Sequence, residues 1–125
     1  METEVILDCS SKQVSLNFSK EYNYTTDHVT EGDFHNFLFP EDNIVVVVQC
    51  ISNVKRPMLR ENVIASDTLM ITGKKVFRSY GYESDSLHFW QEDVYLELPI
   101  SIRIRNASSE TFGPYQEIMD QIKIK

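Results

Sequence analysis

The segment from Val94 to Arg105, VYLELPISIRIR, constrains the fold of this chain more than any other. Apolar residues fill every second position, and tyrosine, glutamate, proline, serine and arginine fill the positions between them. This two-residue period is typical of a β-strand, in which successive side chains point to opposite faces. One face of such a strand must be covered by a core, and the other meets water, a partner or a ligand. The sequence therefore predicts a sheet protein with one long strand here.

Two features place this predicted strand at the edge of its sheet. Pro99 cannot donate a ladder hydrogen bond, and proline within a sheet is confined to edges and bulges. Arg103 and Arg105 are charges of the kind that protect an edge from unwanted pairing. The centre of the sheet is predicted instead at Asn43 to Ile51, where a run of consecutive valines indicates a strand buried on both faces.

Further strands are expected on both sides of this central segment. Alternating patterns predict hairpins over residues 5–18 and 69–80, the second turning at Gly73 and Lys74, where glycine can supply a positive φ. Residues 87–90 are expected to form a short strand. Residues 54–65 fit a short helix and an extended crossing equally well, so this segment is left unassigned.

Two segments have the features of short helices. Residues 31–38 follow Thr30, a favourable N-cap, and precede Pro40, although an ordered loop held by phenylalanines is the alternative. Residues 114–122 begin with proline at the favoured first helical position. Apolar residues follow there at helical spacing, namely Tyr115, Ile118, Met119 and Ile122. A helix this short is expected to dock on the sheet or on another molecule.

These elements predict an α+β fold, mainly an antiparallel sheet or sandwich of about six or seven strands, with the two short helical segments added. The chain has 125 residues, of which 42% are hydrophobic, and this matches a single domain over residues 1–125. No Pro-rich or Ser-rich run marks a linker.

The charge of the chain is concentrated in its first third. Residues 1–42 hold nine acidic residues and two basic ones, which accounts for the whole net charge of −7. An acidic protein repels phosphate backbones, so nucleic acid is not expected to be the main partner. The acidic part would instead attract a basic partner.

The two cysteines, Cys9 and Cys50, are expected to be reduced, because a chain with this apolar content needs no covalent staple. The amino terminus has no basic and apolar leader, and no segment has the apolar length of a membrane span. The sequence therefore predicts a cytoplasmic protein without a membrane anchor. The acceptor motifs at Asn17, Asn23 and Asn106 are expected to remain unmodified in that compartment.

No residue pattern indicates catalysis, a metal or a cofactor. His28, His35 and His88 do not fall at metal-ligand spacings. Asp85 and His88 lie near two serines, but turns are rich in such residues for backbone reasons. Cys50 is expected to be an inert core residue. We therefore expect no enzyme, no bound metal and no cofactor.

The function predicted from these patterns is that of a non-enzymatic interaction or assembly module, such as a small subunit of a larger complex or of a viral or phage particle. A protein partner or self-association is expected, through strand addition at the long edge strand and through the terminal helix. The residues predicted to form this surface are Tyr95, Glu97, Ser101, Arg103, Arg105, Tyr115, Ile118, Met119 and Ile122.

Two alternatives remain open at the level of sequence. One is a ligand-binding β-fold, or an enzyme, whose pocket is lined by aromatic residues. These residues are Tyr80, Tyr82, Phe89, Trp90 and Tyr95. The weaker alternative is single-strand nucleic-acid binding by Arg103 and Arg105 with nearby lysines. Cross-strand charge pairing is the simpler explanation of those two arginines.

Overall fold

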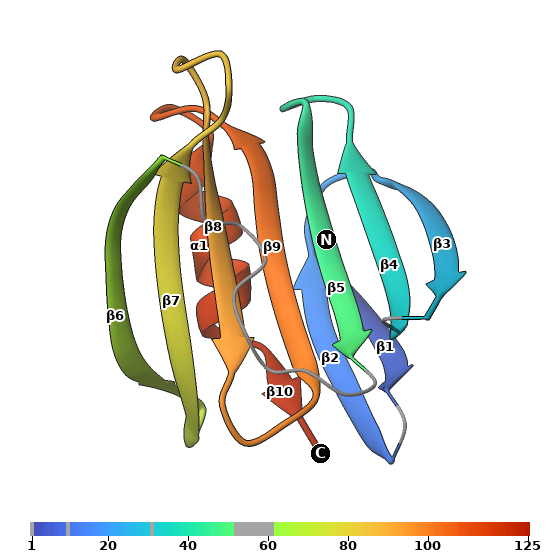
Figure 1. Ribbon diagram of the computed structural model, residues 1–125. Helices are drawn as coiled ribbons and strands as arrows, with labels where there is room; N and C mark the ends of the chain where they lie inside the picture. Colours follow the sequence, from blue (N-terminus) through green and yellow to red (C-terminus); the bar gives the residue numbers. More distant parts are fainter. Residues whose placement is uncertain (1, 10, 31, 52–61) are drawn as a thin grey trace.

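The computed structural model describes residues 2–9, 11–30, 32–51 and 62–125. These residues form ten strands and one helix (Figure 1). In chain order the elements are β1 Thr3–Cys9, β2 Lys12–Phe18, β3 Asn23–Val29, β4 Gly32–Phe39, β5 Ile44–Ile51, β6 Val63–Ile71, β7 Lys74–Tyr82, β8 Phe89–Tyr95, β9 Ile100–Ala107, α1 Phe112–Asp120 and β10 Lys123–Ile124.

The strands form two antiparallel sheets. The larger sheet has seven strands in the order β3-β4-β5-β9-β8-β7-β6, and the smaller has three in the order β1-β2-β10. Helix α1 and the small sheet lie on the same face of the large sheet (Figure 1). The predicted mainly antiparallel α+β class is confirmed, but the strand count of about six or seven matches only the larger sheet. No helix among the described residues is long and apolar enough to cross a membrane.

The hydrophobic core fills the layer between the large sheet and the elements that cover it. Phe18 of β2 packs between Phe37 and Phe39 of β4, with ring centroids 5.0 Å apart in both pairs. Burying each such ring stabilises the fold by roughly 1.5–3 kcal/mol. Further buried members come from β5, β9 and the carboxy-terminal segment, among them Val46, Val48, Ile100, Ile102, Ile104, Tyr115, Met119 and Ile122.

The segment Val94 to Arg105 is a hairpin and not the single long strand predicted. Strand β8 ends at Tyr95, residues 96–99 form a turn, and β9 begins at Ile100. Pro99 lies in this turn, where no ladder donor is needed. The turn also changes which residues face the core, because Ile102 of β9 pairs with Asp93 of β8 and both therefore point to the same face.

The predicted edge position of this segment is also wrong. Strand β9 lies in the middle of the large sheet, with β5 on one side and β8 on the other. The valine-rich segment forms an interior strand as predicted, since β5 pairs with both β4 and β9. It is not fully buried on both faces, because Val46 and Val48 are buried while Val45 and Val47 are partly exposed. The edges of the large sheet are β3 and β6.

The helix predicted at residues 31–38 is wrong, because Gly32 to Phe39 form strand β4 between β3 and β5. The buried phenylalanines there are Phe37 and Phe39, at a strand period of two, whereas Leu38 is exposed. Two neighbouring strands satisfy the backbone of this segment, and this tertiary pairing outweighs the local helix signals.

The other local predictions agree more closely with the structure. Residues 114–122 were predicted to be helical, and α1 spans Phe112–Asp120. The hairpin of β6 and β7 turns at Thr72 and Gly73, one residue before the predicted pair, and both residues have positive φ angles. The unassigned segment 54–65 has three parts. Residues 54–61 lie outside the described residues, Asn62 lies in a turn, and residues 63–65 begin β6.

Gly81 of β7 is expected to be the glycine most sensitive to substitution. A Cβ atom there would lie 2.5 Å from Trp90 Cε2 and 2.7 Å from the carbonyl oxygen of Asn62. We expect Gly81→Ala to lower the free energy of unfolding by about 1–3 kcal/mol in urea denaturation, because overpacking forces the backbone to move. The control is Gly113→Ala in α1, where a Cβ would meet nothing within 4 Å, and which should leave stability unchanged or raise it. Equal stability of the two variants would contradict the expectation.

Candidate interaction surfaces

The predicted interaction surface on the Val94 to Arg105 segment is mostly inside the protein. Tyr95, Ser101 and Arg103 are buried, the last with 5% of its surface exposed. Glu97 is exposed in the turn between β8 and β9, and Arg105 is partly exposed. These five residues therefore do not form one accessible face.

The residues predicted on the terminal helix are similarly divided. Tyr115, Met119 and Ile122 are buried in the core, and Ile118 is a partly buried residue packed against it. The amphipathic pattern thus marks docking of α1 on this chain's own sheets. Of the nine predicted surface residues, only Glu97 is classed as exposed, with Arg105 and Ile118 intermediate.

The polar side chains of β9 are paired across the large sheet. The Arg103 guanidinium donates to Glu92 Oε2 on β8 at 2.8 Å and also to the Gln49 side chain on β5. Ser101 Oγ donates to the same Gln49 oxygen at 3.3 Å. Arg105 lies 2.7 Å from Glu83 Oε1, and its hydrogen bond lowers the pKa of Glu83 below the usual value. Both arginines are therefore committed to internal partners.

A second ion-pair cluster lies between the large sheet and α1. Arg78 of β7 donates two hydrogen bonds of 2.8 Å to Asp93 of β8 and one of 2.6 Å to Asp120 of α1. Burial alone would lower the pKa of Arg78, but the two carboxylates raise it above its ordinary value. Burial raises the pKa of Asp93, and Arg78 opposes that shift. The cluster fixes the end of α1 on the sheet.

A third cluster joins the start of α1 to the turn before β5. Asp42 Oδ2 accepts hydrogen bonds of 2.6 Å from Lys20 Nζ and from the Tyr115 hydroxyl. These bonds lower the pKa of Asp42, and the Asp42 hydrogen bond raises the pKa of Lys20. Burial and Asp42 raise the pKa of Tyr115. Lys20 is thus held as a cation and Tyr115 as a phenol, so neither is prepared to act as a nucleophile or a base.

Among the cavities lined by described residues, two small ones border these side chains. One, of about 120 Å³, is lined by the cluster around Lys20 and Tyr115 and by Ile118 of α1. The other, of about 210 Å³, lies between two turns and is lined by residues that include Lys74, Tyr95 and Glu97. The buried Tyr95 hydroxyl makes no hydrogen bond to any described residue. Tyr95 and Glu97, two of the predicted surface residues, both line this second cavity.

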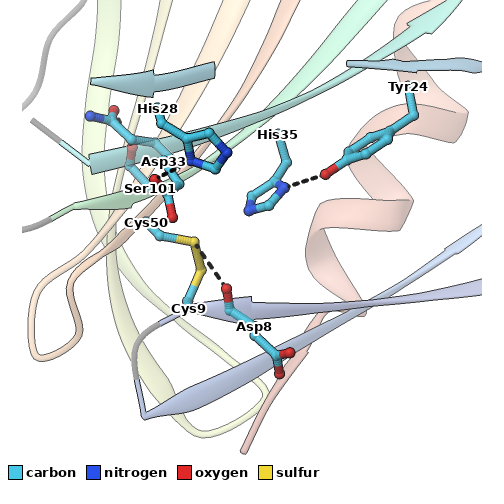
Figure 2. The surroundings of a disulfide bond; sticks show 9 residues. Asp8, Cys9, Tyr24, His28, Asp33, His35, Cys50 and Ser101 are labelled. Carbon is cyan, nitrogen blue, oxygen red and sulfur yellow. Dashed lines mark hydrogen bonds and ion pairs between the residues drawn. A yellow bond between two sulfur atoms is a disulfide. The ribbon is translucent and has the colours of Figure 1, made fainter. Parts of the chain in front are cut away.

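Cys9 and Cys50 form a disulfide, contrary to the prediction that both are reduced. The bond joins β1 of the small sheet to β5 of the large sheet, and the two Cα atoms lie 5.2 Å apart (Figure 2). Sequence spacing could not predict this pairing, since the cysteines are separated by 41 positions and only the stacking of two sheets brings them together.

Two hydrogen-bonded pairs lie close to the disulfide, on the face of β3 and β4 that points toward β1 (Figure 2). Tyr24 of β3 bonds His35 of β4 at 2.7 Å, and His28 bonds Asp33 at the same distance. Burial lowers the pKa of His35 below its ordinary value, although Asp33 opposes this. Among the described residues, no group of three His, Cys, Asp or Glu side chains is placed to hold a metal ion. Each pair joins a side chain of β3 to a side chain of β4.

The two outer strands of the large sheet are its accessible features. All seven side chains of β3 are exposed, as are the first six of β6. Among the described strands β3 pairs only with β4, and β6 only with β7, so one backbone edge of each is left without a described ladder partner. The sequence signal for β3 is weak, since Asn23 to Val29 shows no apolar alternation, and its edge position follows only from strand order.

Loss of Arg78 is expected to be one of the most costly single changes on this chain. Arg78→Ala should lower the free energy of unfolding by about 3–5 kcal/mol in urea denaturation, because Asp93, with 1% of its side chain exposed, is left buried without its cation. Asp120→Ala is the matched control, and it should cost less than about 1 kcal/mol because that carboxylate is 46% exposed. A cost as small for Arg78→Ala as for the control would contradict this assignment.

Removing the disulfide is expected to destabilise the protein without changing its fold. The double variant Cys9→Ala plus Cys50→Ala should lose about 2–4 kcal/mol of unfolding free energy, since the bond closes a long loop in the unfolded chain. The wild-type protein should lose a similar amount in a reducing buffer, and the double variant should be insensitive to reductant. Equal thermal midpoints for the wild-type protein with and without reductant would exclude a stabilising disulfide.

Comparison with known proteins adds no further constraint on these surfaces. No protein-family model, no curated protein and no solved structure matches this chain.

Proposed function

We propose that this protein is a non-enzymatic interaction or assembly module that binds protein partners by strand addition at the outer strands of its large sheet. The main support is that the seven-stranded sheet ends in two long strands, β3 and β6, whose side chains are mostly exposed. An unpaired edge presents a row of backbone donors and acceptors that another strand can complete.

The composition of the two edges supports this proposal. Natural edge strands are usually blunted by proline, by several lysines or by an inward-pointing charge. Neither β3 nor β6 contains proline or lysine, and the protective features they do have are one aspartate each and, in β6, a register shift between Val63 and Ala65. Strand β6 also exposes large apolar side chains, including Ile64 at 57% and Met70 at 62%. Exposed apolar side chains beside an open edge are typical of a surface that a partner covers.

The two alternative functions gain less support from the geometry. Among the described residues, Tyr80 and Phe89 contact Phe112 of α1, whereas Trp90 lies against Gly81. Only Tyr95 lines a cavity described above. A nucleic-acid surface would need free cations, but the three arginines on the large sheet bond Glu83, Glu92 and Asp93.

The disulfide between Cys9 and Cys50 bears on where the protein works. The sequence predicts both reduced thiols and a cytoplasmic location. Because structural disulfides persist mainly in oxidising surroundings, we propose that the chain works in such a compartment, for example at a cell or particle surface. A role as a small subunit of a viral or phage particle is compatible with this location.

Edge variants test the proposed function. We expect Thr25→Lys on β3 or Thr68→Lys on β6 to reduce partner capture or self-association, because a lysine on an edge strand disfavours strand addition. Ser109→Lys, at an exposed residue outside both sheets, is the matched control and should behave as wild type. The measurements are light scattering over a concentration series and a pull-down analysed by mass spectrometry, with unfolding curves to verify folding. A protein that is monomeric at every concentration and captures nothing would refute the proposal.

A further inference from the structure

We infer that β3 is the self-association edge, and that it pairs antiparallel with β3 of a second copy around a two-fold axis through Thr26. The two copies would then share one continuous sheet of twice seven strands. This inference rests on the proposed function, and it adds the partner, the edge and the register.

The sequence of β3 is self-complementary in this register. With Thr26 on the axis, Thr25 of one copy lies opposite Asp27 of the other, and Tyr24 lies opposite His28. The first pair can hydrogen-bond and the second can stack, and cross-strand pairs of these kinds stabilise sheets. Within the seven residues of β3, no two carboxylates face each other, although the strand belongs to the acidic first third of the chain.

The faces of the sheet also match in this arrangement. Tyr24, Thr26 and His28 pair with residues of β4 on the side that carries the core, since Phe37 is the partner of Tyr24. A two-fold axis perpendicular to the sheet keeps these side chains on one common face in both copies. The helix and small sheet of each copy therefore lie on the same side of the joined sheet.

Strand β3 is already ordered for pairing by its bonds to β4. Tyr24 is held by His35, His28 is held by Asp33, and Asp27 accepts a hydrogen bond of 3.1 Å from an asparagine of β4. Side chains that are fixed before association lose less conformational entropy when a partner arrives. The outer edge of β3 therefore has backbone N–H and C=O groups without a described ladder partner, next to side chains that are already fixed by hydrogen bonds.

Strand β6 is less suited to the same symmetric pairing. A full-length antiparallel overlap of two β6 strands has Asp67 at its centre, so the two Asp67 carboxylates would face each other. Like charges directly opposite destabilise a sheet pair. Pairing of β3 with β6 of another copy would not close into a dimer and would form an open-ended polymer. The symmetric β3 pair is therefore the closed assembly that the two edges favour.

Cysteine cross-linking tests the register directly. Thr26→Cys places two thiols opposite each other across the axis, within the Cα separation of a disulfide, so mild oxidation should give a covalent dimer on non-reducing gels. The single variants Thr25→Cys, Asp27→Cys and, on β6, Asp67→Cys are the comparison. Each should cross-link at a rate at least about tenfold lower, since its thiol does not lie opposite the same thiol of the second copy. A mixture of the Thr25→Cys and Asp27→Cys proteins should recover the fast rate. Intact Cys9–Cys50 pairing is verified in each variant by counting free thiols.

Light scattering separates failure of this inference from failure of the proposed function. The wild-type protein should approach twice the monomer mass at high concentration, and Thr25→Lys should stay at the monomer mass while Thr68→Lys does not. Cross-linking no faster for Thr26→Cys than for the other variants, or a mass that keeps rising beyond the dimer, would overturn the β3 pair. If the protein stays monomeric but captures another protein through β3, the inference fails and the proposed function stands. If it neither associates nor captures a partner, both fail.

Discussion

The pairing of β5 with β9 is the contact on which the rest of the structure depends. It joins two meanders, β3-β4-β5 and β6-β7-β8-β9, into one sheet by pairing two strands that are far apart in sequence. Val46 pairs with Ile104 and Val48 with Ile102, so the core face runs across the seam without interruption. Helix α1 and the small sheet dock on that face. Without this seam, neither meander would present an apolar surface wide enough to hold them.

The register at this seam is specified by polar groups as well as by apolar packing. A slip of one residue would turn the isoleucines of β9 away from the core. It would also separate Arg103 from Glu92 and Gln49, leaving a buried cation without its partners. The same logic applies to Arg78 and Asp93 on the neighbouring strands. Charges in the middle of the sheet thus disfavour alternative pairings.

Local elements could be predicted from the sequence where local chemistry decides them. The hairpin turn at Thr72 and Gly73 and the terminal helix are of this kind, since glycine, proline and a helical apolar spacing act within a few residues. The strand Gly32–Phe39 and the turn at residues 96–99 differ from the prediction because strand pairing decides them, with β3 and β5 in the first case and between β8 and β9 in the second. Pro99 was the one signal for that turn.

The candidate surface could not be predicted from the sequence, because exposure follows from strand order. The alternating polar residues of β9 resemble an edge in sequence and lie at the centre of the sheet. Asn23 to Val29 has no apolar period, and it forms an exposed edge. Alternating apolar and polar residues predict that a strand has two different faces. What covers each face depends on the order of the strands in the sheet.

The disulfide has a mechanical consequence. A pulling force that enters at the amino terminus passes from Cys9 directly to Cys50 through a covalent bond. The chain between them, which carries β2, β3 and β4, is bypassed and bears little of the load. At the amino-terminal end, the residues before Cys9 can be drawn out, whereas the loop from Cys9 to Cys50 stays closed while the disulfide is intact. The outer edge at β3 would therefore keep its shape in a molecule under tension.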